Sequence, residues 1–126
     1  EFANGDTDSQ LRLEWASSNS DAVTFQFVLP SDFDTDSDML VWVRGESAGT
    51  TNITSVFTAE TFFNEGDTKV SDTTGAIVAA VSNVSATVAA ADIPSDAKTC
   101  SIELTFGAHT TDAIYVYAIW VTYTKL

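Results

Sequence analysis

Apolar and polar residues alternate along most of this chain, and this period of two predicts β-strands. The alternation is clearest in Leu11–Trp15, Val23–Leu29 and Ile102–Phe106, each with one apolar and one polar face. Clusters of Asp, Ser, Gly and Pro interrupt the alternation at short intervals and predict turns. The order of these signals predicts an all-β fold, an antiparallel, jelly-roll-like β-sandwich of about eight strands.

The middle of the chain predicts strands of a different character. Met39–Arg44 is apolar on both faces, which indicates a central strand, and Gly45–Thr51 has the composition of a loop. Ile53–Phe63 is a long β-branched and aromatic run that predicts one strand with a bend. Two turns are then expected, at Asn64–Asp67 and at Asp72–Gly75.

The segment Ala76–Asp92 allows two interpretations. Four apolar residues fall at helical spacing, Ile77, Val81, Val84 and Val88, and alanine is frequent around them. Against a helix stand several Ser, Thr and Asn residues at interior positions, where they are poor helix formers. We therefore predict two short strands joined near Ser82–Asn83, with a helix as the alternative.

The last predicted strand, Ala113–Thr124, is apolar along both faces. Strict alternation directs four side chains inward: Ile114, Val116, Ala118 and Trp120. The opposite set is Tyr115, Tyr117, Ile119, Val121 and Tyr123. Because a half-buried strand should show water a polar face, we expect this tyrosine face to be covered. A second copy of the chain would make it an interface, for which tyrosine is well suited, and a loop of the same chain or a stacked sugar ring would also cover it.

A length of 126 residues suits one domain with a hydrophobic core. We expect residues 11–126 to form that domain and residues 1–10 to be a polar lead-in, in which Glu1 and Phe2 could derive from a cloning site. With 18 acidic and 5 basic residues, the formal net charge is -13. Neither nucleic acid nor a membrane is an expected partner, because proteins bind anionic phosphates through Lys and Arg, and this chain has only 5 of them.

Four aspartates stand at alternate positions in one predicted loop and could supply oxygen ligands to a hard cation such as calcium. They are Asp32, Asp34, Asp36 and Asp38. The helical calcium-loop motif does not fit, because Ser37 and Val43 occupy its glycine and glutamate positions. A solvated turn, in which Asp side chains accept bonds from backbone amides, is the simpler interpretation. We expect no other cofactor.

Candidate catalytic residues are few. His109 is the only histidine, and no Gly-x-Ser-x-Gly elbow accompanies it. Cys100 is the only cysteine, and its apolar surroundings without a nearby cation indicate a structural residue. No two carboxylates stand out as the pair that glycoside hydrolysis requires. We therefore expect a protein that is not an enzyme and has no catalytic residue.

Two further features have both a plain and a functional interpretation. Asn52–Thr54 and Asn83–Ser85 match the acceptor pattern for N-glycosylation, which arises readily by chance in a chain rich in Ser and Thr. The tryptophans Trp15, Trp42 and Trp120 all lie in predicted strands. Filling the core is the more frequent fate of a strand tryptophan. One of them could instead stack on a sugar ring, as in carbohydrate-binding modules.

The order of short motifs in the chain resembles a known domain family. An early Trp precedes a strand that ends in a Pro-x-Asp-Phe-Asp turn. A further strand and a Gly-Asp turn come next. The closing strand has an Asp before it and an aromatic residue at its end. The matching pieces, from Leu11 to Tyr123, are Trp15, Leu29–Asp34, Leu40–Val43, Gly66–Asp67, Asp92–Pro94, Asp112–Tyr115 and Val121–Tyr123. This pattern is similar to the jelly-roll β-sandwich domain that recurs in structural proteins of tailed bacteriophages.

The resemblance implies a non-enzymatic virion structural protein, either a capsid decoration (cement) protein or a head or tail fibre domain. Such domains are often trimers, so it implies a homo-oligomer that contacts other shell or fibre proteins and is located in the virion. The alternative function is a carbohydrate- or receptor-binding β-sandwich module with glycan partners. The fold alone does not decide between the two, because sandwiches host unrelated functions.

Overall fold

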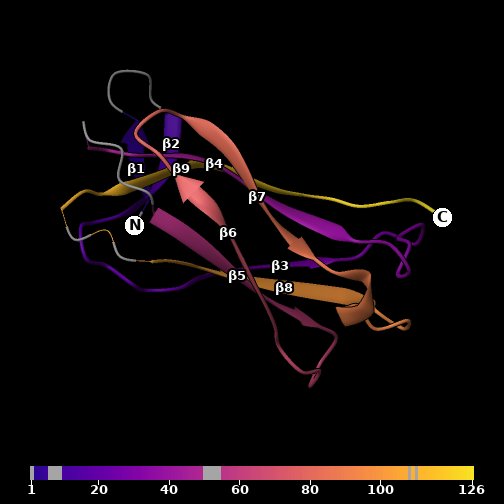
Figure 1. Ribbon diagram of the computed structural model, residues 1–126. Helices are drawn as coiled ribbons and strands as arrows, with labels where there is room; N and C mark the ends of the chain where they lie inside the picture. The colour runs from indigo at the N-terminus through magenta and orange to yellow at the C-terminus, as the bar shows by residue number, and fades with distance from the viewer. Residues whose placement is uncertain (1, 6–9, 50–54, 108, 110) are drawn as a thin grey trace.

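The computed structural model describes residues 2–5, 10–49, 55–107, 109 and 111–126. In these segments the chain forms nine strands and one short 3₁₀ helix, arranged as two antiparallel sheets packed face to face (Figure 1). The predicted antiparallel β-sandwich is therefore confirmed, with nine strands where about eight were expected. No helix in the described part of the chain is long and apolar enough to cross a membrane.

The first sheet has five strands in the order β1-β2-β9-β4-β7. Its members are β1 (Phe2–Gly5), β2 (Gln10–Trp15), β9 (Ile114–Thr122), β4 (Met39–Ser47) and β7 (Ser82–Val88). As predicted, β4 is an interior strand, between β9 and β7, but it continues to Ser47 through the start of the predicted loop. The backbone of β1 pairs with β2, so these residues of the predicted lead-in belong to the sheet.

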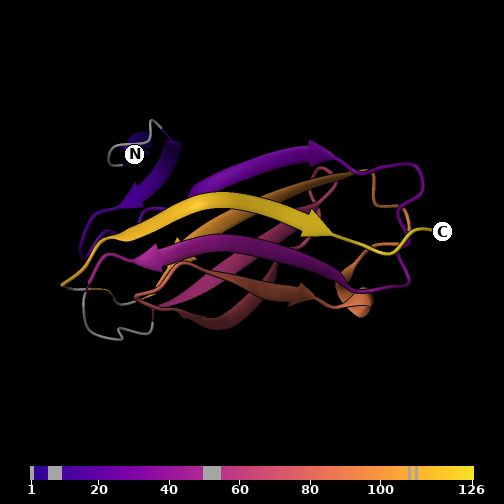
Figure 2. The ribbon, with the colours of Figure 1, turned by 90° about the horizontal axis from the view of Figure 1, so that it is seen from above.

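The second sheet has four strands in the order β3-β8-β5-β6. Its members are β3 (Val23–Val28), β8 (Thr99–Phe106), β5 (Ser55–Phe63) and β6 (Val70–Ile77). The predicted turn at Asn64–Asp67 connects β5 to β6, and Asn64 and Gly66 both adopt positive φ there. Seen from above, β3 runs along the side of β9 that faces away from β4, although the two strands belong to different layers (Figure 2).

The core lies between the sheets and is built from the alternate inward positions of the strands. Residues of β4 and β8 alternate strictly between buried and less buried positions, as the sequence predicts for strands with one face on the core. Full burial of a large apolar side chain contributes roughly 1.5–3 kcal/mol. The largest apolar side chains buried in this way are Phe57, Phe63, Met39, Ile77, Ile102, Leu104 and Ile114.

The predicted turn at Asp72–Gly75 is wrong. These residues lie within β6, where the backbone of Asp72 pairs with Ala59 and that of Thr73 pairs with Thr58. Turn-forming residues are tolerated here because pairing with a neighbouring strand overrides a weak local preference.

The strand interpretation of Ala76–Asp92 is confirmed, and the helical alternative is wrong. The end of β6 and the whole of β7 occupy this segment, but they are joined by residues 78–81 and not near Ser82–Asn83. The only helical element in this segment is one 3₁₀ turn, η1 (Ala90–Asp92). Pairing of β7 with β4 along its whole length explains why helical spacing of the valines does not prevail.

A β-bulge in β9 changes which side chains face the core. Arg44 pairs with Ala118, but the next residue, Gly45, pairs with Val116, so Tyr117 is an extra residue in β9. Before the bulge Ile114 and Val116 are buried, and after it the inward side chains are Ile119, Val121 and Tyr123. The bulge thus turns Ala118 and Trp120 to the outside, contrary to the sequence-based prediction of strict alternation.

Candidate functional site

The outward surface of the five-stranded sheet carries a group of aromatic side chains on its two central strands. It consists of Trp42 on β4 and Tyr115, Tyr117 and Trp120 on β9, and we call it the outer aromatic face. All four side chains are half-buried, so each has part of its surface in contact with solvent. Tyr115 to Trp120 span roughly 16 Å of strand, several times the width of one sugar ring.

Trp42 and Trp120 lie directly opposite each other on β4 and β9, and their rings stack in parallel. The ring centroids are 5.8 Å apart and the planes differ by 2°. An aromatic pair of this kind contributes about 0.5–1.5 kcal/mol beyond the area it buries. The indole Nε1 of Trp42 also donates a 2.9 Å hydrogen bond to Oγ1 of Thr122. The two rings are therefore held in a fixed relative orientation, with part of their apolar surface in contact with water.

Charged residues surround the two tyrosines of the outer aromatic face. The Cζ atom of Arg12 lies 3.7 Å from the ring centroid of Tyr115, a cation–π contact. The guanidinium of Arg12 is also 3.6 Å from Oε2 of Glu14. The hydroxyl of Tyr117 donates a 2.5 Å hydrogen bond to Oε1 of Glu46. This end of the face thus combines aromatic rings with oriented hydrogen-bonding groups.

The environment of Tyr117 keeps its phenol protonated. Partial burial and the adjacent Glu46 carboxylate raise the pKa of Tyr117 above 10.0. Since the folded state holds this proton more tightly, the corresponding stability is present below pH 10 and is lost as the pH rises above it. At neutral pH the hydroxyl is therefore a fixed donor to Glu46.

The side of the face formed by β7 is polar. Nη1 of Arg44 donates a 3.1 Å hydrogen bond to Oδ1 of Asn83, the residue paired with it on β7. Asn83 also belongs to a predicted glycosylation pattern and is exposed, whereas the pattern at Asn52–Thr54 lies outside the described residues. The amide and guanidinium groups extend the set of hydrogen-bonding groups beside the Trp pair.

The interface predicted at Tyr115, Tyr117, Ile119, Val121 and Tyr123 does not form one face. Only Tyr115 and Tyr117 lie on the outside, because the bulge turns the other three toward the core. Tyr123 packs on Phe33 with ring centroids 5.4 Å apart, and its hydroxyl is 3.3 Å from Oδ1 of Asp32. A loop of the same chain, one of the three expected covers, therefore covers Tyr123.

Three of the four aspartates predicted as calcium ligands, Asp32, Asp34 and Asp38, make separate side-chain contacts. Asp34 accepts hydrogen bonds from the amide of Asp36 (3.0 Å) and from the hydroxyl of Ser37 (2.7 Å), and both lower the pKa of Asp34. Asp38 accepts a 2.8 Å bond from the amide of Ala90, and Asp32 pairs with Lys125 at 3.4 Å. In the described part of the chain, no three or more His, Cys, Asp or Glu side chains are grouped to hold a metal ion. The loop has the hydrogen bonds of the predicted Asp-rich turn.

His109 links two loops and has no catalytic neighbour in its hydrogen bonds. Its Nδ1 is 3.0 Å from the carbonyl oxygen of Asp112, and its Nε2 is 2.7 Å from that of Asn19. The amide of Ser18 donates a 3.1 Å bond to the carbonyl oxygen of His109. The ring is buried, so it joins the loop after β2 to the loop before β9.

Cys100 is fully buried in β8, and burial raises the pKa of its thiol to about 12. Because the thiolate is the reactive form, we predict that a soluble disulfide reagent does not label the native protein at pH 8. Complete labelling is expected after unfolding in guanidinium chloride, which serves as the control. The release of the chromophore in each state measures the labelled fraction, and fast labelling of the native protein would contradict the burial.

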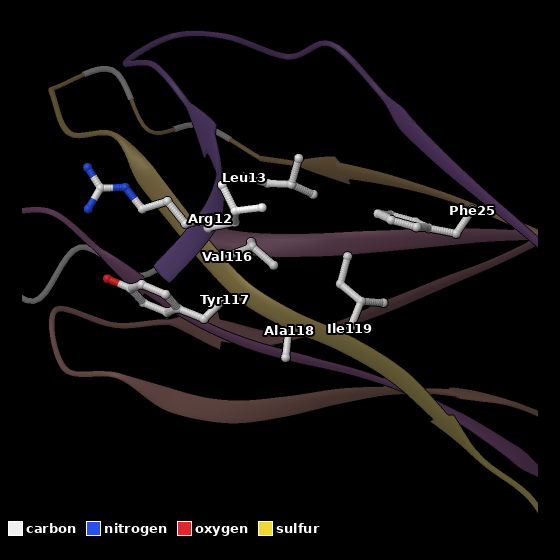
Figure 3. Close-up of a pocket in the computed structure, with 8 residues that line it drawn as sticks. Arg12, Leu13, Phe25, Val116, Tyr117, Ala118 and Ile119 are labelled. Carbon is white, nitrogen blue, oxygen red and sulfur yellow. The ribbon is translucent and has the colours of Figure 1, made fainter. Parts of the chain in front are cut away.

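A groove opens between the two sheets beside the outer aromatic face. It has a volume of about 260 Å³ and is lined mainly by apolar side chains, among them Leu11, Leu13, Phe25, Val116 and Ile119. Figure 3 shows Phe25 of β3 and Ile119 of β9 on its two sides, with Arg12 and Tyr117 at one end. We call this side of the sandwich the open flank.

Comparison with known proteins identifies a similar fold but no family for this chain. No protein-family model matches the chain, and no curated protein matches it in sequence. Among solved structures, a family 61 carbohydrate-binding module in complex with β-1,4-galactotriose is similar, with a TM-score of 0.58 and 9% sequence identity. The match covers 96% of this chain and 75% of that one. The chain thus shares the β-sandwich fold of a carbohydrate-binding module, and the likeness does not indicate the bacteriophage origin expected from the motif resemblance.

Sequence reasoning located only part of the outer aromatic face. The sequence allows Trp42 or Trp120 to stack on a sugar ring but favours a position in the core for both. Tyr115 and Tyr117 were placed on the outside, while their contacts with Arg12 and Glu46 were missed because these join strands far apart in the sequence. Gly45 was the one signal of the bulge, since a glycine within a strand often marks a bulge or a close backbone approach.

Proposed function

We propose that this chain is a non-catalytic carbohydrate-binding module that binds glycan on its outer aromatic face. The stacked pair of Trp42 and Trp120 on the water-facing side of the sheet is the observation that carries the proposal. The similarity of the fold to a carbohydrate-binding module solved with a bound trisaccharide supports it. Of the two functions expected from the sequence, this is the alternative one.

The chemistry of the face suits a sugar chain. A pyranose ring has apolar C–H faces that pack on aromatic rings, and hydroxyl groups around its rim that need hydrogen-bond partners. The Trp pair offers partly exposed apolar rings, while Tyr117, Glu46 and Asn83 offer oriented polar groups at the sides. Because these groups are held by the sheet and by one another, little ordering is needed on binding.

The charge of the chain favours a neutral glycan. With a net charge of -13, the protein repels polyanions such as sulfated or uronic-acid polysaccharides at low salt. The two arginines of the outer face already have partners: Arg12 contacts Glu14, and Arg44 contacts Asn83. A neutral β-linked oligosaccharide, with galactotriose as the first probe, is therefore the expected ligand class.

Titration of neutral oligosaccharides while recording tryptophan fluorescence tests the proposal. We expect a saturable change with galactotriose or another neutral glycan, because Trp42 and Trp120 are partly exposed whereas Trp15 is buried. Calorimetry with the same sugars provides the affinity independently of fluorescence. The absence of both a fluorescence change and heat across a broad panel of neutral glycans would reject the proposed function.

The virion structural role implied by the motif resemblance stays a prediction. No observation on the outer aromatic face requires a shell or fibre partner, and the similar solved structure is a carbohydrate-binding module. The two functions are compatible in principle, because receptor-binding modules of fibres also bind glycans. The sugar titration addresses the binding function whichever protein carries the module.

A further inference from the structure

The edge of β9 that faces away from β4 is only partly paired. β2 pairs with β9 at Ile114–Val116 alone, whereas β4 pairs with β9 from Ile114 to Thr122. From Tyr117 to Thr122, no strand in the described part of the chain pairs with this edge. The boundary coincides with the bulge at Tyr117, and a bulge bends the strand that contains it.

The open edge has neither the charges nor the proline that commonly prevent strand pairing between molecules. Protected edges carry lysine or other charges, proline, or a covering segment. Residues 117–122 of β9 read Tyr-Ala-Ile-Trp-Val-Thr, and β3, on the same flank, reads Val-Thr-Phe-Gln-Phe-Val. Neither contains a charge or a proline, although the chain carries 18 acidic residues.

The side chains of the open flank are apolar and partly exposed. Leu11 of β2, which lines the groove, is 62% exposed. The inward residues Phe25 and Ile119 are only half-buried, and they line the groove between the sheets (Figure 3). On the opposite flank β6 lies against β7, so there the two sheets close on each other.

We propose that the open flank is the interface of a symmetric dimer, in which the β9 edges of two copies pair antiparallel. A second copy is the occupant that the flank fits, because an antiparallel edge is self-complementary about a two-fold axis. Two chains of net charge -13 repel each other, so they associate best through a surface without charges. Apolar side chains around Leu11 and the groove are then removed from water on both copies.

The dimer has a consequence for the outer aromatic face. A two-fold axis perpendicular to the sheet keeps the same face of both copies on the same side. Two outer aromatic faces then lie side by side on one continuous sheet. If the proposed glycan binding holds, the dimer binds a long polysaccharide at two sites and gains avidity.

Light scattering coupled to size exclusion, over a range of protein concentrations, tests the dimer. We expect a species of twice the 13.5 kDa chain mass for the wild type. Leu11→Lys is expected to raise the dissociation constant of the dimer at least about tenfold, by placing like charges in the interface. Val81→Lys is the matched control, since Val81 is exposed (41%) but lies between β6 and β7, and it should leave the dimer intact.

Amide hydrogen exchange gives a second measurement that is independent of sugar. Exchange at residues 117–122 should slow as the protein concentration rises, and Leu11→Lys should abolish that dependence. A monomer at all concentrations, an equal effect of Leu11→Lys and Val81→Lys, or an open-ended series of aggregates would overturn the proposal. A monomer that still binds a soluble oligosaccharide would leave the proposed function standing and reject only the dimer.

Discussion

Trp120→Ala is expected to weaken glycan binding by about thirtyfold, because a tryptophan at the centre of a binding surface contributes on the order of 2 kcal/mol. Trp42→Ala should have a similar effect, since it removes both the stacked partner and the hydrogen bond to Thr122. Calorimetric titration of the glycan identified with the wild-type protein measures both. The midpoint of thermal unfolding should fall only slightly, because both rings are half-buried on the outside of the sheet.

Conservative and distant variants separate a binding role from a structural one. Trp120→Phe keeps an apolar aromatic ring and should bind glycan more tightly than Trp120→Ala does. A gain in folding stability alone would not explain that recovery of affinity. Phe62→Ala removes a half-buried aromatic side chain of β5 on the other sheet and should leave the affinity unchanged. Equal losses in Trp120→Ala and Phe62→Ala would show that stability, and not the outer aromatic face, controls binding.

The general architecture of this protein could be predicted from its sequence. Where strands have one face on the core, as in β2, β3 and β8, the alternation of apolar residues gave strands close to those observed. This works because side chains of a strand point to opposite faces with a fixed period of two. The β6 strand was missed because its pairing with β5, a tertiary contact, outweighs the turn residues at Asp72–Gly75.

The outer face of β9 could not be predicted, because one extra residue reverses the order of inward and outward positions. The apolar residues on both sides of β9 predict a strand with two buried faces. In the structure it is instead two half-strands with opposite phase: Ile114 and Val116 face the core before the bulge, and Ile119 and Val121 after it. Trp120 therefore lies on the outside of the sheet, whereas strict alternation predicts that it lies in the core.

The position of the bulge depends on Gly45, where the backbones of β4 and β9 approach closely. A Cβ atom at Gly45 would lie 2.6 Å from the carbonyl oxygen of Tyr115, a distance that real Cβ atoms essentially never show. The backbone of one strand would have to move, and Tyr115 and Tyr117 would move with it. Gly45 therefore couples the stability of the sheet to the geometry of the outer aromatic face.

Gly45→Ala is expected to destabilise the protein by about 2 kcal/mol, through forced displacement of a packed backbone, and to lower the thermal midpoint by roughly 8 °C. It should also weaken glycan binding. Gly66→Ala is the control: Gly66 has a φ of 86° but nothing within 4 Å of the added Cβ, so backbone strain should cost about 1 kcal/mol without any effect on binding. Thermal unfolding and calorimetric titration of both variants measure the two effects. Unchanged stability in Gly45→Ala would contradict the close approach of β4 and β9, and with it the bulge that places Trp120 on the outer aromatic face.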